Sequence, residues 1–160
     1  GEDEPVATKT GDIDNTKQTT PTEKTSDDDD EEDEPSNIFK VGDIIETKDL
    51  KITFVSVKDY KDDNVFVQPK KDHKYIQAYF EFENISDSNQ YANGTDFECY
   101  ADDYAVDQNY FADDFLDAKL SPSKKAKGSV CFEVPKKSKS IVLEYETDFW
   151  SEKKVIFVVK

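Results

Sequence analysis

Short runs of alternating apolar and polar residues fill residues 38–160, and Phe, Tyr, Val and Ile supply most of the apolar positions. The clearest run is 75–83, in which every second residue from Ile76 to Phe82 is apolar. Side chains of a strand point alternately to its two faces, so a period of two predicts a half-buried β-strand. The same pattern predicts strands at 43–46, 50–58, 95–101, 128–134, 140–147 and 154–159, and a short helical turn leading into a strand within 110–120. Seven to eight short strands, with no long segment of helical period, are typical of an all-β, antiparallel β-sandwich.

The run at 50–58 contains a change of phase. Leu50, Ile52 and Phe54 alternate regularly, and the apolar positions then resume at Val55. A β-bulge inserts one extra residue into a strand and reverses the faces of the side chains that follow. We therefore expect a bulge near Phe54 or Val55.

Two long connections separate the predicted strands, at residues 60–74 and 102–117. Both are longer than a typical hairpin loop, and long loops on a rigid sandwich are where binding residues concentrate. We therefore expect these two loops to be the contact regions of the domain.

The second of these loops is rich in aspartate. Carboxylate oxygens are the ligands that Ca²⁺ prefers, and the ion takes six to eight oxygens. The calcium candidates are Asp102, Asp103, Asp107, Asp113 and Asp114. Because their spacing matches no known calcium loop, a solvated acidic loop is the alternative interpretation. No cofactor is predicted.

Aromatic residues are interleaved with these aspartates. We name Tyr104, Tyr110 and Phe111 as candidates for contact with a partner, because aromatic anchors dominate protein interfaces. The alternative is that these side chains simply cover the open end of the sandwich.

Residues 1–37 have a different composition from the rest of the chain. They hold 14 acidic residues and 3 Lys, a net charge of −11 out of −16 for the whole chain. Low hydrophobicity and high charge predict a disordered linker that is extended by repulsion between like charges. A polyanion also repels phosphate backbones, which excludes nucleic acid as a partner. The chain thus divides into a disordered acidic linker, 1–37, and one folded domain, 38–160.

The two cysteines fall on opposite faces of their predicted strands. Cys99 shares a face with Phe97, whereas Cys131 lies opposite Val130 and Phe132. Regular alternation therefore directs the two sulfurs to different sides of a sheet, which argues against a disulfide unless a bulge reverses the parity.

The single histidine, His73, precedes the clearest strand. A catalytic His needs a nucleophile and an orienting carboxylate, and neither is recognisable from the spacing. We therefore predict an exposed loop residue.

Six stretches together form a distinctive pattern: Val41–Asp43, Tyr75–Ser86, Phe97–Asp102, Leu120–Pro122, Gly128–Pro135 and Tyr145–Trp150. They resemble a family of secreted or lipid-anchored immunoglobulin-like domains of unknown function from Gram-positive bacteria. The family is related in fold to a mycobacterial immunoprotective extracellular antigen, and the resemblance covers residues 38–160. It implies an immunoglobulin-like sandwich outside the membrane and supplies no active site.

Two positions depart from that family. It often has Gly where Asp103 and Ser123 stand in this chain. Asp and Ser can also hold tight turns, and Asp tolerates the left-handed region. We therefore expect the same turns at both places.

The linker, the sandwich and the resemblance together lead to a functional expectation. We expect a non-catalytic binding or interaction module, displayed extracellularly and anchored to the outer face of the cytoplasmic membrane. The chain contains no Met, so we expect that residues upstream of residue 1 have been removed, and the family resemblance implies that they include a signal peptide and a lipid anchor. The partner would be an unknown protein or a cell-envelope ligand. The alternatives are a calcium-dependent ligand-binding domain that uses residues 102–117, and a hydrolase that uses two carboxylates.

Overall fold

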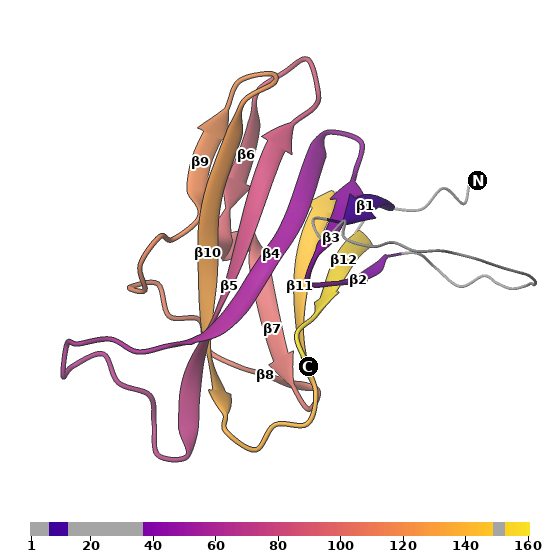
Figure 1. Cartoon of the computed structure of the whole chain (residues 1–160). Coiled ribbons are helices and arrows are strands. Elements are labelled where there is room, and N and C mark those ends of the chain that lie inside the picture. The colour runs from indigo at the N-terminus through magenta and orange to yellow at the C-terminus, as the bar shows by residue number, and fades with distance from the viewer. Residues whose placement is uncertain (1–6, 13–36, 149–152) are drawn as a thin grey trace, which may run out of the picture.

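The computed structural model describes residues 7–12, 37–148 and 153–160. These residues form two five-stranded sheets that face each other, with a separate strand pair at one end (Figure 1). In spatial order, the first sheet contains β1 (Thr8–Asp12), β3 (Asp43–Glu46), β4 (Leu50–Tyr60), β5 (His73–Asn84) and β10 (Lys125–Pro135). The second contains β2 (Ile38–Lys40), β12 (Lys153–Val158), β11 (Ile141–Asp148), β7 (Phe97–Ala101) and β8 (Tyr104–Ala105). The separate pair is β6 (Gln90–Asn93) with β9 (Asp117–Leu120), and a 3₁₀ turn, Gly94–Asp96, connects β6 to β7.

This architecture confirms the predicted β-sandwich. The strand pairs are antiparallel, except that β2 runs parallel to β12. The predicted bulge is also confirmed, because the β4–β5 register shifts between Phe54 and Ser56. Within the described part of the chain, no helix is long and apolar enough to cross a lipid bilayer.

The core lies between the two sheets and is built around aromatic rings. Phe80 on β5 stacks on Phe54 at 4.9 Å between ring centroids and meets Phe97 and Phe157 of the opposite sheet at 4.8 and 5.0 Å. These side chains are the inward positions of the period-two pattern, and all four are buried. Each buried Phe contributes roughly 1.5–3 kcal/mol through burial of apolar surface.

The predicted disorder of residues 1–37 is wrong at one segment. Thr8–Asp12 forms β1 and pairs with β3, and Ala7 is buried. The Lys9 ammonium lies 3.2 Å from a carboxylate oxygen of the buried Asp43. Backbone pairing along a free sheet edge needs no apolar run, which is why composition did not reveal the strand. The rest of the predicted linker, including the acidic run 27–34, lies outside the described residues.

The helical turn predicted near residue 110 is also wrong, whereas the strand after it is confirmed as β9. Asn109 Oδ1 accepts a hydrogen bond from the Phe111 N–H at 2.9 Å, and Asp114 has a positive φ of 64°. An Asn side chain that bonds the backbone two residues on competes with helix formation, and a left-handed residue interrupts it.

Both departures from the resembled family adopt the turns that were expected. Asp103 and Ser123 each have a φ of 72°, in the left-handed region that favours Gly.

Candidate functional site

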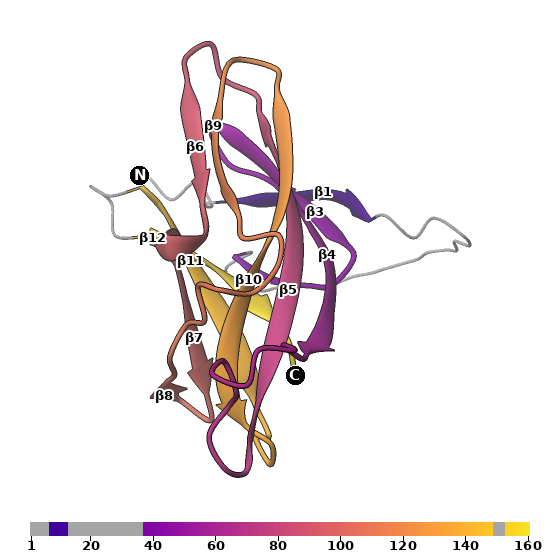
Figure 2. The same ribbon diagram turned by 90° about the vertical axis from the view of Figure 1, so that its left-hand side faces the viewer.

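Residues 106–116, here called the strap, connect β8 to β9 and run across β10 (Figure 2). They pair with the edge of β10 that faces away from β5. Four backbone hydrogen bonds of 2.7–2.9 Å hold them there: Asn109 N to Cys131 O, Glu133 N to Asp107 O, Ser129 N to Asp114 O, and Leu116 N to Ser129 O. The strap thus covers a sheet edge whose N–H and C=O groups would otherwise be open to other chains.

Gly128 permits this close approach. A Cβ atom at this position would stand 2.6 Å from the Cα of Leu116, a separation that real side chains do not tolerate. The residue that begins Gly128–Pro135, one of the stretches that resemble the family, therefore has a packing function at the strap.

Polar groups fasten the strap to the outer face of the first sheet. Gln77 Nε2 donates to the carbonyl oxygen of Asp113 at 2.8 Å and to Ser129 Oγ at 3.0 Å. Ser129 Oγ donates in turn to the Asp113 carbonyl at 2.9 Å. Gln77 and Ser129 are both buried, although the alternation of the strands places them on the outer face. Their hydrogen bonds satisfy polar groups that would be costly to bury alone.

A second apolar cluster lies beneath the strap, apart from the main core. It contains Tyr75, Ala112 and Cys131, with Tyr60 and Val67 packed against it. This cluster joins the strap to the β4–β5 loop, residues 61–72, because its side chains come from or adjoin both segments.

The two cysteines confirm the prediction from strand parity. Cys99 belongs to the core between the sheets and Cys131 to the second cluster, and both are free and buried. Burial raises the pKa of each thiol to about 12, so neither is ionised at neutral pH. A buried, protonated thiol is chemically inert.

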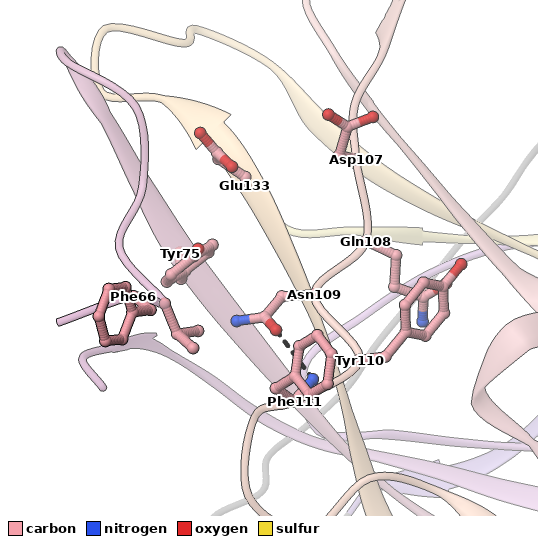
Figure 3. A pocket seen from close by; sticks show the side chains of 9 residues that line it. Phe66, Tyr75, Asp107, Gln108, Asn109, Tyr110, Phe111 and Glu133 are labelled. Carbon is pink, nitrogen blue, oxygen red and sulfur yellow. Dashed lines mark hydrogen bonds between the residues drawn. The ribbon is translucent and has the colours of Figure 1, made fainter. Parts of the chain in front are cut away.

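A cleft of about 240 Å³ opens between the β4–β5 loop and the strap (Figure 3). Aromatic rings and polar groups together form its lining. The residues that matter here are Phe66, Tyr75, Asp107, Asn109, Phe111 and Glu133. The two loops that the sequence indicated as contact regions therefore meet at one site.

Two aromatic rings stand exposed at the rim. Phe66 of the β4–β5 loop is 91% exposed and Phe111 of the strap is 76% exposed. Their side chains lie on opposite sides of Asn109 (Figure 3). The neighbouring Val65 is also exposed and lies outside the lining. Large apolar groups gathered at one surface site are typical of interaction sites.

The amide group of Asn109 forms part of the cleft wall and lacks a partner. Its residue is only 8% exposed, and its Oδ1 is occupied by the Phe111 N–H. Its Nδ2 forms no hydrogen bond with a nitrogen or oxygen atom of any described residue and points toward Tyr75 and Phe66 (Figure 3). A hydrogen bond from this amide tends to lower the pKa of the Cys131 thiol, but burial outweighs it. A buried donor without an acceptor costs about 1–3 kcal/mol, so the cleft favours a ligand that brings an acceptor.

The cleft is electrostatically negative. Glu133 Oε2 accepts a hydrogen bond from the Lys70 N–H at 2.7 Å, which pins the β4–β5 loop to β10. Neither Glu133 nor Asp107 takes part in the ion pairs found among the described residues. The pKa of the Tyr75 hydroxyl is raised, first by burial and then by the negative charge of Glu133. The field in the cleft therefore favours positive charge.

The predicted contact residues are all exposed, but only two of them line the cleft. Tyr110 and Phe111 do so, whereas Tyr104 lies in β8 away from it. The Tyr110 ring packs edge-on against Phe115 at 6.1 Å. Sequence reasoning missed Phe66, Asn109 and Glu133. An available signal was Val65–Val67, a run of three apolar residues within an otherwise polar loop.

The predicted calcium ligands are dispersed. Asp102 caps the backbone N–H groups of Lys139 and Ser140, and Asp114 accepts from the Tyr79 hydroxyl. Asp103 lies in a turn, Asp107 lines the cleft, and Asp113 acts through its carbonyl. In the part of the chain that the structure describes, no three His, Cys, Asp or Glu side chains come together to hold a metal ion. Calcium binding stays a prediction that has no preassembled site.

Comparison with known proteins identifies a family and a set of structural relatives. Residues 39–155 match the family model described as "Domain of unknown function (DUF4352)". No curated protein matches the chain.

Three solved structures resemble the fold. The putative lipoprotein ycdA of Bacillus subtilis matches with a TM-score of 0.59 and 16% identity over 70% of this chain, which spans only 36% of ycdA. An uncharacterized β-sandwich protein of Clostridium difficile matches with a TM-score of 0.54 and 14% identity over 83% of this chain and 100% of its own. The secreted protein MPT63 of Mycobacterium tuberculosis gives a TM-score of 0.48 and 12% identity over 72% of this chain and 82% of its own.

Proposed function

This chain belongs to the DUF4352 family, and we propose that it is a non-catalytic binding module displayed outside the cytoplasmic membrane on a lipid anchor. Its binding site is the cleft between the β4–β5 loop and the strap. One observation carries this proposal: exposed aromatic rings flank a buried amide donor that has no partner, on a rigid sandwich. Such a combination of apolar surface and a few oriented polar groups is typical of ligand sites.

The chemistry of the cleft favours recognition over catalysis. Its polar groups are two amides, two tyrosine hydroxyls and two carboxylates, all of which can bind and orient a ligand. The Cys131 thiol beneath it is protonated at neutral pH and therefore a poor nucleophile. The aromatic residues supply contact area at low cost in conformational entropy.

The proposed location is supported by the relative described as a putative lipoprotein and by the acidic composition of residues 1–37. The test is expression of the complete gene with an epitope tag, followed by labelling with radioactive palmitate. We expect a labelled protein in the membrane fraction that external protease removes from intact protoplasts. An unlabelled protein in the cytosolic fraction would overturn the location.

The binding site is tested with immobilised protein and a cell-envelope extract of a Gram-positive bacterium. We expect the double variant Phe66→Ala/Phe111→Ala to retain less than about a tenth of the captured material, because both apolar rims are removed. The control is Tyr91→Ala, which removes another exposed aromatic ring, on β6 and outside the cleft. Equal capture by the double variant and the wild type would refute the assignment.

A further inference from the structure

We propose that the cleft receives a single lysine side chain, presented by an extended segment of a partner protein. The aromatic rim would contact the aliphatic stem of the lysine, and the carboxylates would bind its ammonium group. The Asn109 amide would donate a hydrogen bond to a main-chain carbonyl beside that lysine. This inference rests on the proposed binding function and specifies its ligand.

The size of the cleft favours a single side chain of a partner protein as its occupant. Its volume is about 240 Å³. Sites for drug-sized ligands usually measure about 300–1,000 Å³, so this cleft is small for such a molecule and suits one residue of a larger partner. The exposed rings of Phe66 and Phe111 extend the contact surface beyond the cavity, where neighbouring residues of the partner would lie.

The negative charge of the cleft favours a positively charged occupant. Asp107 and Glu133 line the cleft without forming an ion pair with the described residues. The whole chain carries a net charge of −16, which attracts basic partners and repels anionic polymers. A charge-assisted hydrogen bond from an ammonium group to Glu133 or Asp107 would be among the strongest contacts available in the site.

The aromatic rim suits the rest of a lysine side chain. The four methylene groups would pack against Phe66 and Phe111, and the ammonium group would extend toward Asp107 and Glu133. The ammonium also gains from the faces of nearby rings through cation–π attraction. A phosphate or carboxylate ligand would have neither of these contacts.

Asn109 explains why the lysine should be part of a polypeptide. Its Nδ2 is a buried donor that forms no hydrogen bond with a nitrogen or oxygen atom of the described residues, so an occupant that offers an acceptor would satisfy it. An ammonium group has none, whereas the main-chain carbonyls on either side of a lysine residue do. A free amine would leave the amide of Asn109 unsatisfied.

The test is a titration of the ¹⁵N-labelled chain, residues 1–160, with the blocked peptide acetyl-Ala-Lys-Ala-amide, followed by NMR. We expect saturable shifts of the Asn109 side-chain amide and of the Phe66 and Phe111 backbone amides. The same peptide with norleucine in place of lysine keeps the stem and loses the charge, and it should bind about tenfold more weakly. n-Butylammonium, which lacks the carbonyl, should also bind about tenfold more weakly.

Two variants with matched controls locate the interaction. Glu133→Gln keeps an acceptor for the Lys70 N–H and removes the charge, so it should weaken lysine peptide binding about tenfold. Glu81→Gln removes one charge from β5 outside the cleft and should leave binding within about twofold. Phe66→Ala should reduce affinity about fivefold through lost packing, whereas Val65→Ala on the same loop should not.

The outcomes separate this inference from the proposed function. Equal binding of the norleucine peptide would show that charge is not recognised, and equal binding of butylammonium would show that a free amine suffices. Either result overturns the lysine assignment, as does an absence of shifts. If envelope capture still depends on Phe66 and Phe111, the binding module stands and only its ligand is wrong.

Discussion

The molecule has two apolar clusters that differ in how they are closed. The cluster between the sheets is sealed on both sides by strands and contains stacked Phe rings, including Phe80. The cluster under the strap is small, is closed by loop backbone held through Gln77 and Ser129, and opens into the cleft. The main core and the cleft proposed here as a binding site therefore lie on separate faces of the first sheet.

Two phenylalanines give the largest contrast between these regions. Phe80→Ala should lower the free energy of unfolding by about 3–5 kcal/mol, because it leaves a cavity among Phe54, Phe97 and Phe157. Phe66→Ala should change it by less than about 0.5 kcal/mol, because that ring is 91% exposed. Urea denaturation measures both, and similar losses in the two variants would contradict the separation.

A methyl group added under the strap gives the next largest effect. Gly128→Ala should lower the free energy of unfolding by about 1–3 kcal/mol, because the new Cβ would meet the backbone of Leu116 at 2.6 Å. Denaturation with NMR detection should show the largest shifts in the strap and small shifts in β7 and β11.

The control is Gly11→Ala in β1, where the nearest atom beyond the neighbouring residues is an Ile44 methyl at 3.9 Å. That variant should be nearly neutral. A Gly128 variant as stable as the Gly11 variant would show that the strap is not held against β10.

The alternating pattern was sufficient for the sandwich because the long strands of both sheets alternate apolar and polar residues in their own sequences, whereas the short strands β2, β6 and β8 were not predicted. The Phe54–Val55 phase change even located the bulge. Strand β1 was missed because it attaches to the free edge of β3 and through an ion pair between Lys9 and Asp43. These two residues are 34 positions apart in the sequence. No local pattern encodes such a pairing.

The candidate site was predictable only in outline. Long connections indicated which two loops to examine, and the structure shows that they form one cleft. The unpartnered amide of Asn109 arises from the pairing of the strap with β10, a contact between distant segments. The alternating pattern likewise predicts that a polar residue such as Gln77 is exposed, and Gln77 is buried only because the strap covers it.

The ion pair at β1 predicts a moderate effect that depends on pH. Burial tends to raise the pKa of Asp43, but hydrogen bonds from the Lys40 N–H and the Lys9 ammonium outweigh it, so the pKa is lowered. The resulting stability is present above about pH 4, the pKa of an unfolded Asp, and is lost as the pH falls toward the folded value. Lys9→Gln should lower the free energy of unfolding at pH 7 by less than about 1 kcal/mol.

The difference between Lys9→Gln and the wild type should shrink as the pH falls below about 4 and the Asp43 carboxyl takes up a proton. Lys40→Ala provides the control, because its ammonium is farther from Asp43, at 3.8 Å, and its backbone N–H is retained. Urea titrations across pH test this, and a pH-independent difference would exclude the ion pair as the cause.

The smallest expected effect is at the turn before β10. Ser123→Gly should raise the free energy of unfolding by up to about 1 kcal/mol, because Ser123 has a φ of 72° and Gly relieves the left-handed strain. Ser121→Gly, at a residue that does not have a positive φ, should instead lower the free energy of unfolding by a few tenths of a kcal/mol. Equal changes in the midpoint of thermal unfolding would show that the turn stores no strain.

Native-state hydrogen exchange tests most directly whether the cleft region is energetically separate from the sandwich. The account predicts that the amide protons of Asn109 and Leu116, which bond to β10, exchange through an opening at least about 2 kcal/mol less costly than the opening of the β5–β10 ladder. Exchange of strap and ladder amides at one common free energy would contradict it, because the strap and the sandwich would then unfold as a single unit.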